Sequence, residues 1–135
     1  MKNYVNASLV FVMGLLFMVA CGPAEEDTPD RDKFIGEWTC TEANRKLPAY
    51  RVAILEDGQV QENVLLQNFG QLGDQAKPSG QASGDHLTVS PQYCLDNSWQ
   101  VEGTGVLVTN KRMDWNYKLN DGSTLYDITA VYDRN

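Results

Sequence analysis

The segment MDWNYKL, residues 113–119, constrains the fold more than any other part of the chain. Apolar and polar residues alternate without a break, so Met113, Trp115, Tyr117 and Leu119 share one face of an extended strand. Strict alternation is the pattern of a half-buried β-strand, whereas an amphipathic helix repeats every three to four residues. After the turn sequence NDGS, the segment LYDITAVY repeats the alternation with Tyr126, Ile128, Ala130 and Tyr132 on one side. The C-terminal third therefore predicts two antiparallel strands over an apolar core.

Shorter alternating runs fill the rest of the chain from Phe34 onward, and none shows a helical period. They recur about every 10–12 residues with turn sequences between them, which is typical of a sandwich or barrel. Because short turns join consecutive strands, the simplest topology is an antiparallel meander. We therefore predict an all-β fold, an antiparallel up-and-down barrel of about seven or eight strands.

Glycines and prolines refine this prediction at several points. Asp57-Gly58 predicts a hairpin turn in which the glycine supplies a positive φ. The strand after it is expected to continue to Gly70, while Pro78 favours a loop or weak edge strand. Gly103 and Gly105 lie inside a predicted strand and indicate a bend or a close backbone approach.

The first 20 residues differ from the rest. Ala7 to Ala20 carries no charge, and Lys2 supplies a small basic region before it. A spanning helix needs about 20 apolar residues, so this run is short for a membrane anchor, which remains the alternative. The pattern predicts a secretory signal peptide over residues 1–20 that is removed by cleavage.

The sequence MVAC, ending at Cys21, resembles a bacterial lipobox. The resemblance implies cleavage before Cys21 and attachment of lipid to its thiol. Such an anchor is physically reasonable, since two or three acyl chains hold a protein stably whereas one holds it only marginally. An ordinary signal peptide with a chance cysteine is the alternative. From Gly22 to Lys33 the chain has no large apolar residue, so residues 21–33 are predicted to be a flexible tether. The folded domain is then expected over residues 34–135.

Cysteine number and charge add two expectations. If Cys21 carries lipid, Cys40 and Cys94 are left in an oxidising compartment, which favours a disulfide between them over two buried thiols.

All 18 acidic residues follow Ala20, and of the 11 basic residues only Lys2 precedes it. An acidic domain without a basic stripe argues against nucleic acid as a partner, because such binding depends on Lys and Arg.

The chain offers little that resembles a catalytic constellation. His86 is the single histidine, and Cys94, eight residues later, is the candidate nucleophile for it. The acidic side chains of Glu37, Glu42, Glu62 and Glu102 are expected on outward positions of their strands. No metal site or cofactor motif is recognised, and we expect a protein without enzymatic activity.

An ordered set of short motifs resembles one family. Gly36-x-Trp38 opens the first strand; further on come Asn68-Phe69-Gly70, Pro91-Gln92, Val101-x-Gly103-x-Gly105 and Tyr132-Asp133-Arg134. Together they resemble the lipocalin-like lipoproteins of Bacteroidetes. The resemblance implies a lipocalin-like barrel, anchored to the outer membrane through Cys21, in which Trp38 packs across the closed end with Arg134 against its ring. CGPAEED resembles an acidic export signal and implies the cell-surface face, whereas a plain solvated tether leaves the periplasmic face open.

Two functions other than catalysis remain open. The first is a binding protein that holds a small apolar or glycan-like ligand in the barrel mouth. Its contacts would be the aromatic faces of Trp99, Trp115 and Tyr117, unless these side chains belong to the core. The second is a protein-binding module, such as an inhibitor or an accessory subunit of a surface complex. A barrel of about eight strands is only just wide enough for its own side chains or one small ligand, so a filled interior would disfavour the first function.

Overall fold

The structure is a computed structural model that describes residues 29–135. The predicted signal peptide, the lipidation site Cys21 and most of the predicted tether lie outside the described residues. The secondary structure consists of a 3-10 turn η1 (Asp30–Lys33), a 3-10 turn η2 (Phe69–Gln71) and eight strands. The strands are β1 (Gly36–Glu42), β2 (Tyr50–Glu56), β3 (Asn63–Gln67), β4 (Ser79–Ser83), β5 (His86–Cys94), β6 (Trp99–Thr109), β7 (Arg112–Asn120) and β8 (Leu125–Asp133).

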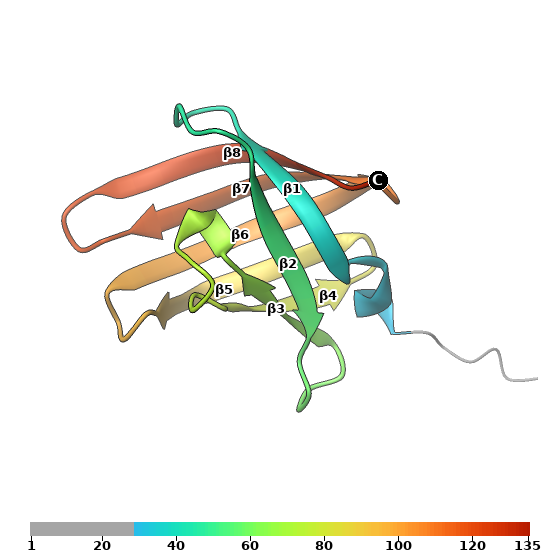
Figure 1. The fold of residues 1–135 in the computed structure, drawn as a ribbon. Helices are drawn as coiled ribbons and strands as arrows, with labels where there is room; N and C mark the ends of the chain where they lie inside the picture. The colour runs from blue at the N-terminus through green and yellow to red at the C-terminus, as the bar shows by residue number, and fades with distance from the viewer. Residues whose placement is uncertain (1–28) are drawn as a thin grey trace, which may run out of the picture.

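The eight strands form a closed antiparallel barrel in which each strand pairs with the next and β8 returns to β1 (Figure 1). The closing pair aligns Cys40 with Tyr132 and Glu42 with Ala130. This confirms the predicted all-β, up-and-down barrel. In Figure 1 the β1–β2 connection and η2 lie toward the left-hand end, while η1 and the C-terminus lie at the right-hand end. We call the left-hand end the mouth and the right-hand end the closed end.

The alternating sequence sets which side chains face inward. On β7 the four residues predicted to share a face are buried, and on β8 Ile128, Ala130 and Tyr132 are buried as well. On β1 the inward row contains Trp38 and Cys40, and the same alternation brings Glu42 inward too. The expectation that Glu42 lies outward is therefore wrong, because its position in the strand overrides its charge.

Two glycines of β6 let large aromatic side chains lie against the strand. Gly105 is the register partner of Trp115, and Gly103 is the partner of Tyr117. A Cβ on Gly105 would overlap the indole ring of Trp115, and one on Gly103 would come within 2.5 Å of the Tyr117 Cβ. The predicted close approach at these glycines is confirmed.

Several boundaries differ from the prediction. β3 ends at Gln67, because the chain turns there through Asn68 and Gly70, both at positive φ. Gly58 does not adopt a positive φ, since a longer connection rather than a tight hairpin joins β2 to β3. Pro91 lies within β5, at an irregularity in the β5–β6 register between Val89 and Gln92, where a missing N–H is tolerated.

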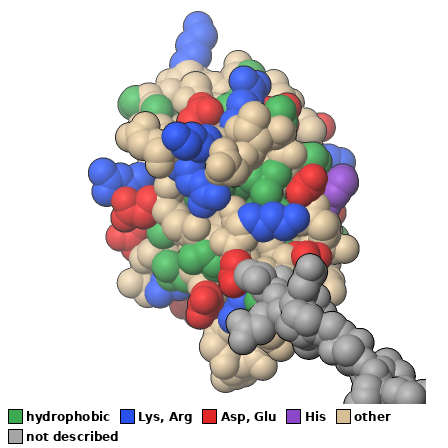
Figure 2. All heavy atoms as spheres, turned by 90° about the vertical axis from the view of Figure 1, so that its right-hand side faces the viewer, with side chains coloured by type: hydrophobic (Ala, Val, Ile, Leu, Met, Phe, Trp, Pro, Cys, Tyr) green, Lys and Arg blue, Asp and Glu red, His purple; other side chains and the backbone are tan. Residues whose placement is uncertain are grey.

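The closed end is covered by η1. Arg31 donates from Nη1 to the main-chain carbonyls of Asp57, Val60 and Asn63, at 3.0 to 3.1 Å. Residues 30–33 therefore dock onto the barrel, and the predicted flexible tether is wrong for this part. Figure 2 looks at this end and shows acidic and basic side chains intermixed over it, with small apolar areas between them.

Cys40 and Cys94 are free thiols in the structure, so the predicted disulfide between them is wrong. The reason is topological. Cys40 lies on β1, whose neighbours are β2 and β8, whereas Cys94 ends β5, whose neighbours are β4 and β6. The two strands stand on opposite walls of the barrel, and core side chains fill the space between them.

Candidate functional site

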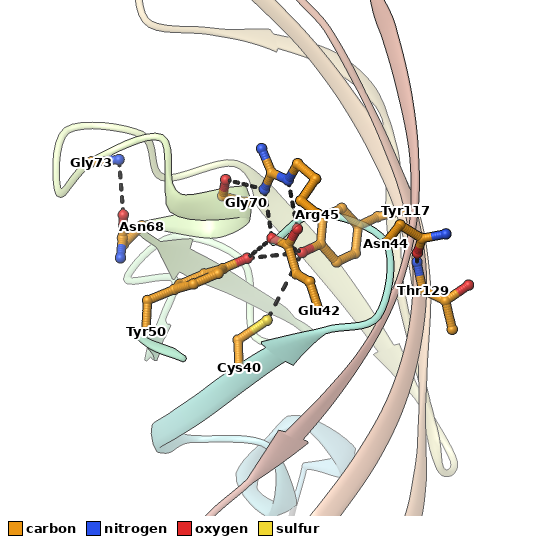
Figure 3. Close-up of polar contacts among 10 residues, drawn as sticks. All are labelled: Cys40, Glu42, Asn44, Arg45, Tyr50, Asn68, Gly70, Gly73, Tyr117 and Thr129. Atoms are coloured by element: carbon orange, nitrogen blue, oxygen red, sulfur yellow. Dashed lines mark hydrogen bonds and ion pairs between the residues drawn. The ribbon is translucent and has the colours of Figure 1, made fainter. Parts of the chain in front are cut away.

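A buried carboxylate with three side-chain donors lies at the barrel mouth (Figure 3). Glu42 is the last residue of β1, and its side chain has no exposed surface. Its partners come from three parts of the chain: Arg45 from the β1–β2 connection, Tyr50 from the start of β2, and Tyr117 from the middle of β7. We call Glu42, Tyr50, Tyr117 and Arg45 the mouth cluster.

The two carboxylate oxygens of Glu42 divide their partners unequally. Oε1 accepts from Arg45 Nε, while Oε2 accepts from Arg45 Nη2, from the Tyr50 hydroxyl and, at 2.9 Å, from the Tyr117 hydroxyl. The two tyrosine oxygens are 2.8 Å apart. Arginine thus binds the carboxylate with both arms of its fork, a geometry that gives strong, directional ion pairs.

Arg45 also joins two connections across the mouth. Its Nη2 donates to the Gly70 carbonyl of η2 at 2.9 Å, and its Cζ lies 5.8 Å from the centre of the Tyr126 ring. Two asparagines fix the same connections: Asn44 accepts from the Thr129 main chain, and Asn68 accepts from the Gly73 main chain. Figure 3 shows these contacts grouped around the mouth cluster.

The cluster sets the ionisation of its members. Burial raises the pKa of Glu42, but hydrogen bonds from Arg45, Tyr50 and Tyr117 outweigh it, and the resulting pKa lies below the ordinary glutamate value. Burial is also the main reason why the pKa values of Tyr50 and Tyr117 are raised. Cys40, whose Sγ is 3.9 Å from the Tyr117 hydroxyl, has a pKa raised to about 11, mainly by burial. The cluster is thus a fixed anion among neutral hydroxyls, and its carboxylate is suited to hold a cation rather than to accept a proton.

The predicted ligand contacts do not meet in one open site. Trp115 and Tyr117 are buried in the core, where Phe69 of η2 packs against both, with ring centroids 5.8 and 4.8 Å away. Trp99 is only partly buried and packs against Tyr126 instead. Phe69 therefore occupies the place in the mouth where the sequence analysis put a ligand.

Two polar atoms of the interior have no partner within the described residues: Trp115 Nε1 and the Tyr132 hydroxyl. Both side chains are fully buried, and their rings are 5.1 Å apart. A buried donor without a partner is costly, and it commonly indicates an unseen water or ligand. The interior wall thus retains unused hydrogen-bonding capacity close to the mouth cluster.

The candidate pair His86 and Cys94 is not brought together. They are the first and last residues of β5, which places them roughly 26 Å apart along an extended strand. His86 is exposed, and burial raises the pKa of the Cys94 thiol. Within residues 29–135 there is also no group of three His, Cys, Asp or Glu side chains arranged to hold a metal ion. None of the helices in that range has the length and hydropathy of a membrane span.

A second candidate site is a groove on the outside of the barrel. Three adjoining hollows of about 350, 80 and 390 Å³ follow the outer faces of β5, β6 and β7. Glu102 and Lys118 line both the first and the second hollow, while Gln100 and Asn120 line both the second and the third. Tyr93, which is 60% exposed, stands at the far end. We call this continuous surface the outer groove.

Neither site was predicted from the sequence, for identifiable reasons. Glu42 could have been found, because it follows Trp38 and Cys40 at every second position of the same strand and therefore shares their inward face. Arg45 lies in the connection between β1 and β2, where no alternation of apolar and polar residues indicates which way a side chain points. The outer groove depends on the register of three strands, which alternation alone does not supply.

Fold and site together define a class: a small closed antiparallel barrel with a filled interior and a mouth fastened by a buried ion pair. No family model and no curated protein matches the chain. Among solved structures, a redesigned beta barrel is similar, with a TM-score of 0.49 and 18% identity over 81% of this chain and 97% of that chain. The fold stated above rests on the strand pairing of this chain itself, and that likeness adds nothing about function.

Proposed function

We propose that the protein is a lipocalin-like lipoprotein of the outer membrane that binds a glycan-like ligand along the outer groove and has no catalytic activity. The lipobox sequence ending at Cys21 supports the anchor, and the closed barrel is compatible with the family resemblance. The observation that carries the binding proposal is the outer groove, a continuous surface on which polar side chains lie among apolar ones, with an exposed aromatic ring at one end.

The chemistry of the outer groove suits a sugar chain. Sugar hydroxyls donate and accept hydrogen bonds, and the side chains of Gln100 and Asn120 do both, while Glu102 accepts and Lys118 donates. Tyr93 offers an aromatic face, on which the C–H face of a sugar ring can stack. A purely apolar ligand would leave these polar groups without partners, so the apolar alternative is less suited to this surface.

The interior offers no comparable space. Phe69, Trp115, Tyr117 and Tyr132 are each at most 1% exposed, and they pack against one another along the barrel axis. A ligand of sugar size would have to displace these rings, at the cost of their buried apolar surface. This is why we place the ligand outside the barrel rather than in its mouth.

The proposed anchor and the proposed binding surface are compatible. η1, the first described element, packs at the closed end, so a lipid on Cys21 would attach the barrel from that side. The end of the outer groove that carries Tyr93 lies at the end of β5, and the β7–β8 turn with Asp121 and Gly122 lines the same hollow. The membrane would then leave the outer groove accessible to a ligand.

The proposal is tested by capture from the native membrane with the lipidated protein, followed by mass spectrometry of bound glycans and proteins. We expect a glycan that the wild type retains and that Tyr93→Ala and Gln100→Ala each lose by at least tenfold. Val108→Ser is the matched control, because Val108 is 55% exposed and does not line the outer groove. Recovery of a protein in place of a glycan, lost in the same variants, would establish a protein-binding module instead. Equal recovery from all variants would overturn the site.

A further inference from the structure

We propose that the mouth cluster is a binding site for the guanidinium group of a small alkylguanidine, and that the chain's own Arg45 occupies this site when no such ligand is bound. The site is separate from the outer groove, and the inference does not depend on the proposed glycan ligand. It rests on four observations about Glu42 and its surroundings.

The Glu42 carboxylate is held in position by groups other than Arg45. The hydroxyls of Tyr50 and Tyr117 both donate to Glu42 Oε2, and each tyrosine is held in place by a strand of the barrel. The Glu42 side chain has no exposed surface, so its charge needs a cation close by. Removing Arg45 would therefore leave the carboxylate in position and still in need of a cation.

Arg45 is the exchangeable member of the cluster. It lies in the connection between β1 and β2, and its side chain is 22% exposed, whereas its partner is fully buried. A guanidinium that entered from solvent would find the contacts that Arg45 uses now: the Glu42 carboxylate, the Gly70 carbonyl and the face of Tyr126. Exchange would replace one set of contacts by an equivalent set, so it avoids leaving the charge buried and unpaired.

The geometry favours a guanidinium over an ammonium group. Two nitrogen atoms of Arg45 bind the two oxygens of Glu42 in a fork, and one of them also reaches Gly70. A planar guanidinium can make all three contacts at once, whereas an ammonium group is a point charge without the fork.

The unpaired interior atoms are an independent sign of an absent partner. Tyr132 is the register partner of Cys40, and the Cys40 thiol contacts Tyr117. Trp115 is the register partner of Ala130, which in turn pairs with Glu42, and neither its Nε1 nor the Tyr132 hydroxyl has a hydrogen bond within the described residues.

The first test uses the wild-type protein. The Nε–H resonance of Arg45 is followed by NMR, assigned by its loss in Arg45→Lys, while methylguanidinium chloride is added, with methylammonium chloride as the matched control. We expect a saturable change of the Arg45 signal, with a midpoint at least tenfold lower for methylguanidinium. An unchanged signal, or equal responses to both cations, would show that the ion pair is a permanent structural contact and would overturn the proposal.

The second test removes the Arg45 side chain from the mouth cluster. Arg45→Ala should bind methylguanidinium at least tenfold more tightly than the wild type, and Arg45→Ala combined with Glu42→Gln should lose that gain. Tyr93→Ala should leave the affinity unchanged, which separates this site from the outer groove. If Arg45→Ala is unfolded, methylguanidinium but not methylammonium should restore its fold. A failure of methylguanidinium to bind or to restore the variant counts against the proposal.

Discussion

The guanidinium of Arg134 lies over the indole ring of Trp38, with 4.1 Å between the Arg134 Cζ and the ring centre. The same side chain donates to the main-chain carbonyls of Lys33, Ile35 and Asn110. Trp38 in turn donates from Nε1 to the Phe34 carbonyl at 2.8 Å. One arginine thus ties the last described strand, the start of the barrel and the β6–β7 turn together at the closed end. This is the contact between Trp38 and Arg134 that the family resemblance implied.

Arg134→Lys should destabilise the domain by about 2–3 kcal/mol, because a lysine keeps the charge but cannot reach three carbonyls while stacking on the ring. Urea denaturation followed by tryptophan fluorescence measures the change. Arg112→Lys is the control, since Arg112 is exposed and its contact with Asp114 is a surface ion pair. Equal stabilities of the two variants would contradict the role of Arg134.

Glu42→Gln should lower the free energy of unfolding by about 3–5 kcal/mol, the usual cost of removing one partner of a buried ion pair. The reason is that Arg45 would lose its counter-charge, and that the amide has one acceptor oxygen where the carboxylate offers two to Arg45 and the tyrosine hydroxyls. Glu37→Gln on the same strand is the control, because its contact with Arg51 is exposed. A loss for Glu42→Gln as small as that of the control would show that the cluster contributes little to stability.

Acid should remove the contribution of Glu42. Its pKa in the folded protein lies below the ordinary value of 4.5, so the carboxylate contributes stability above that pH and loses it as the pH falls through the folded-state value. We therefore expect the stability difference between the wild type and Glu42→Gln to be constant near neutral pH and to shrink below about pH 4.5. Urea titrations at a series of pH values measure it. A difference that grows on acidification would show that the sign of the pKa shift is wrong.

Gly105→Ala should destabilise the barrel by about 1–3 kcal/mol, because the added methyl group would overlap the indole ring of Trp115 within a packed core. Thermal unfolding followed by near-ultraviolet circular dichroism reports both the midpoint and the packing of the tryptophan. Gly58→Ala is the matched control, since nothing lies within 4 Å of a Cβ at that position. A midpoint for Gly105→Ala equal to that of Gly58→Ala would show that Trp115 can move away without cost.

The barrel could be predicted from the sequence, because the alternation of apolar and polar residues can be recognised within each strand separately. The inward faces of β7 and β8 could be assigned residue by residue, and short turns between strands left few topologies. The mouth cluster could not be found in this way. Tyr117 is separated from Glu42 by 75 positions, and only closure of the barrel brings the two together. The charge of Glu42 favoured an outward position, whereas its place in the alternation of β1 favoured an inward one. In the structure the side chain lies inward.

The cysteines show a related limit. Counting them gave Cys40 and Cys94 as the natural pair once Cys21 was assigned to lipid. Counting contains no information about which wall of a barrel each residue occupies. β1 and β5 are separated by three strands in either direction, so these two thiols face different parts of the core.

The pairing of β1 with β8 has a consequence for how the chain reaches its fold. Cys40 and Tyr132 are neighbours in the barrel but come from opposite ends of the described chain. The cylinder therefore cannot close until the last strand is present, and contacts between such distant segments form slowly, because the loop between them must first be ordered. If the chain is exported, as proposed above, a partly translocated molecule could make hairpins but not the mouth cluster or the Arg134 contact. Release of the final strand would be the event that commits the protein to its native state.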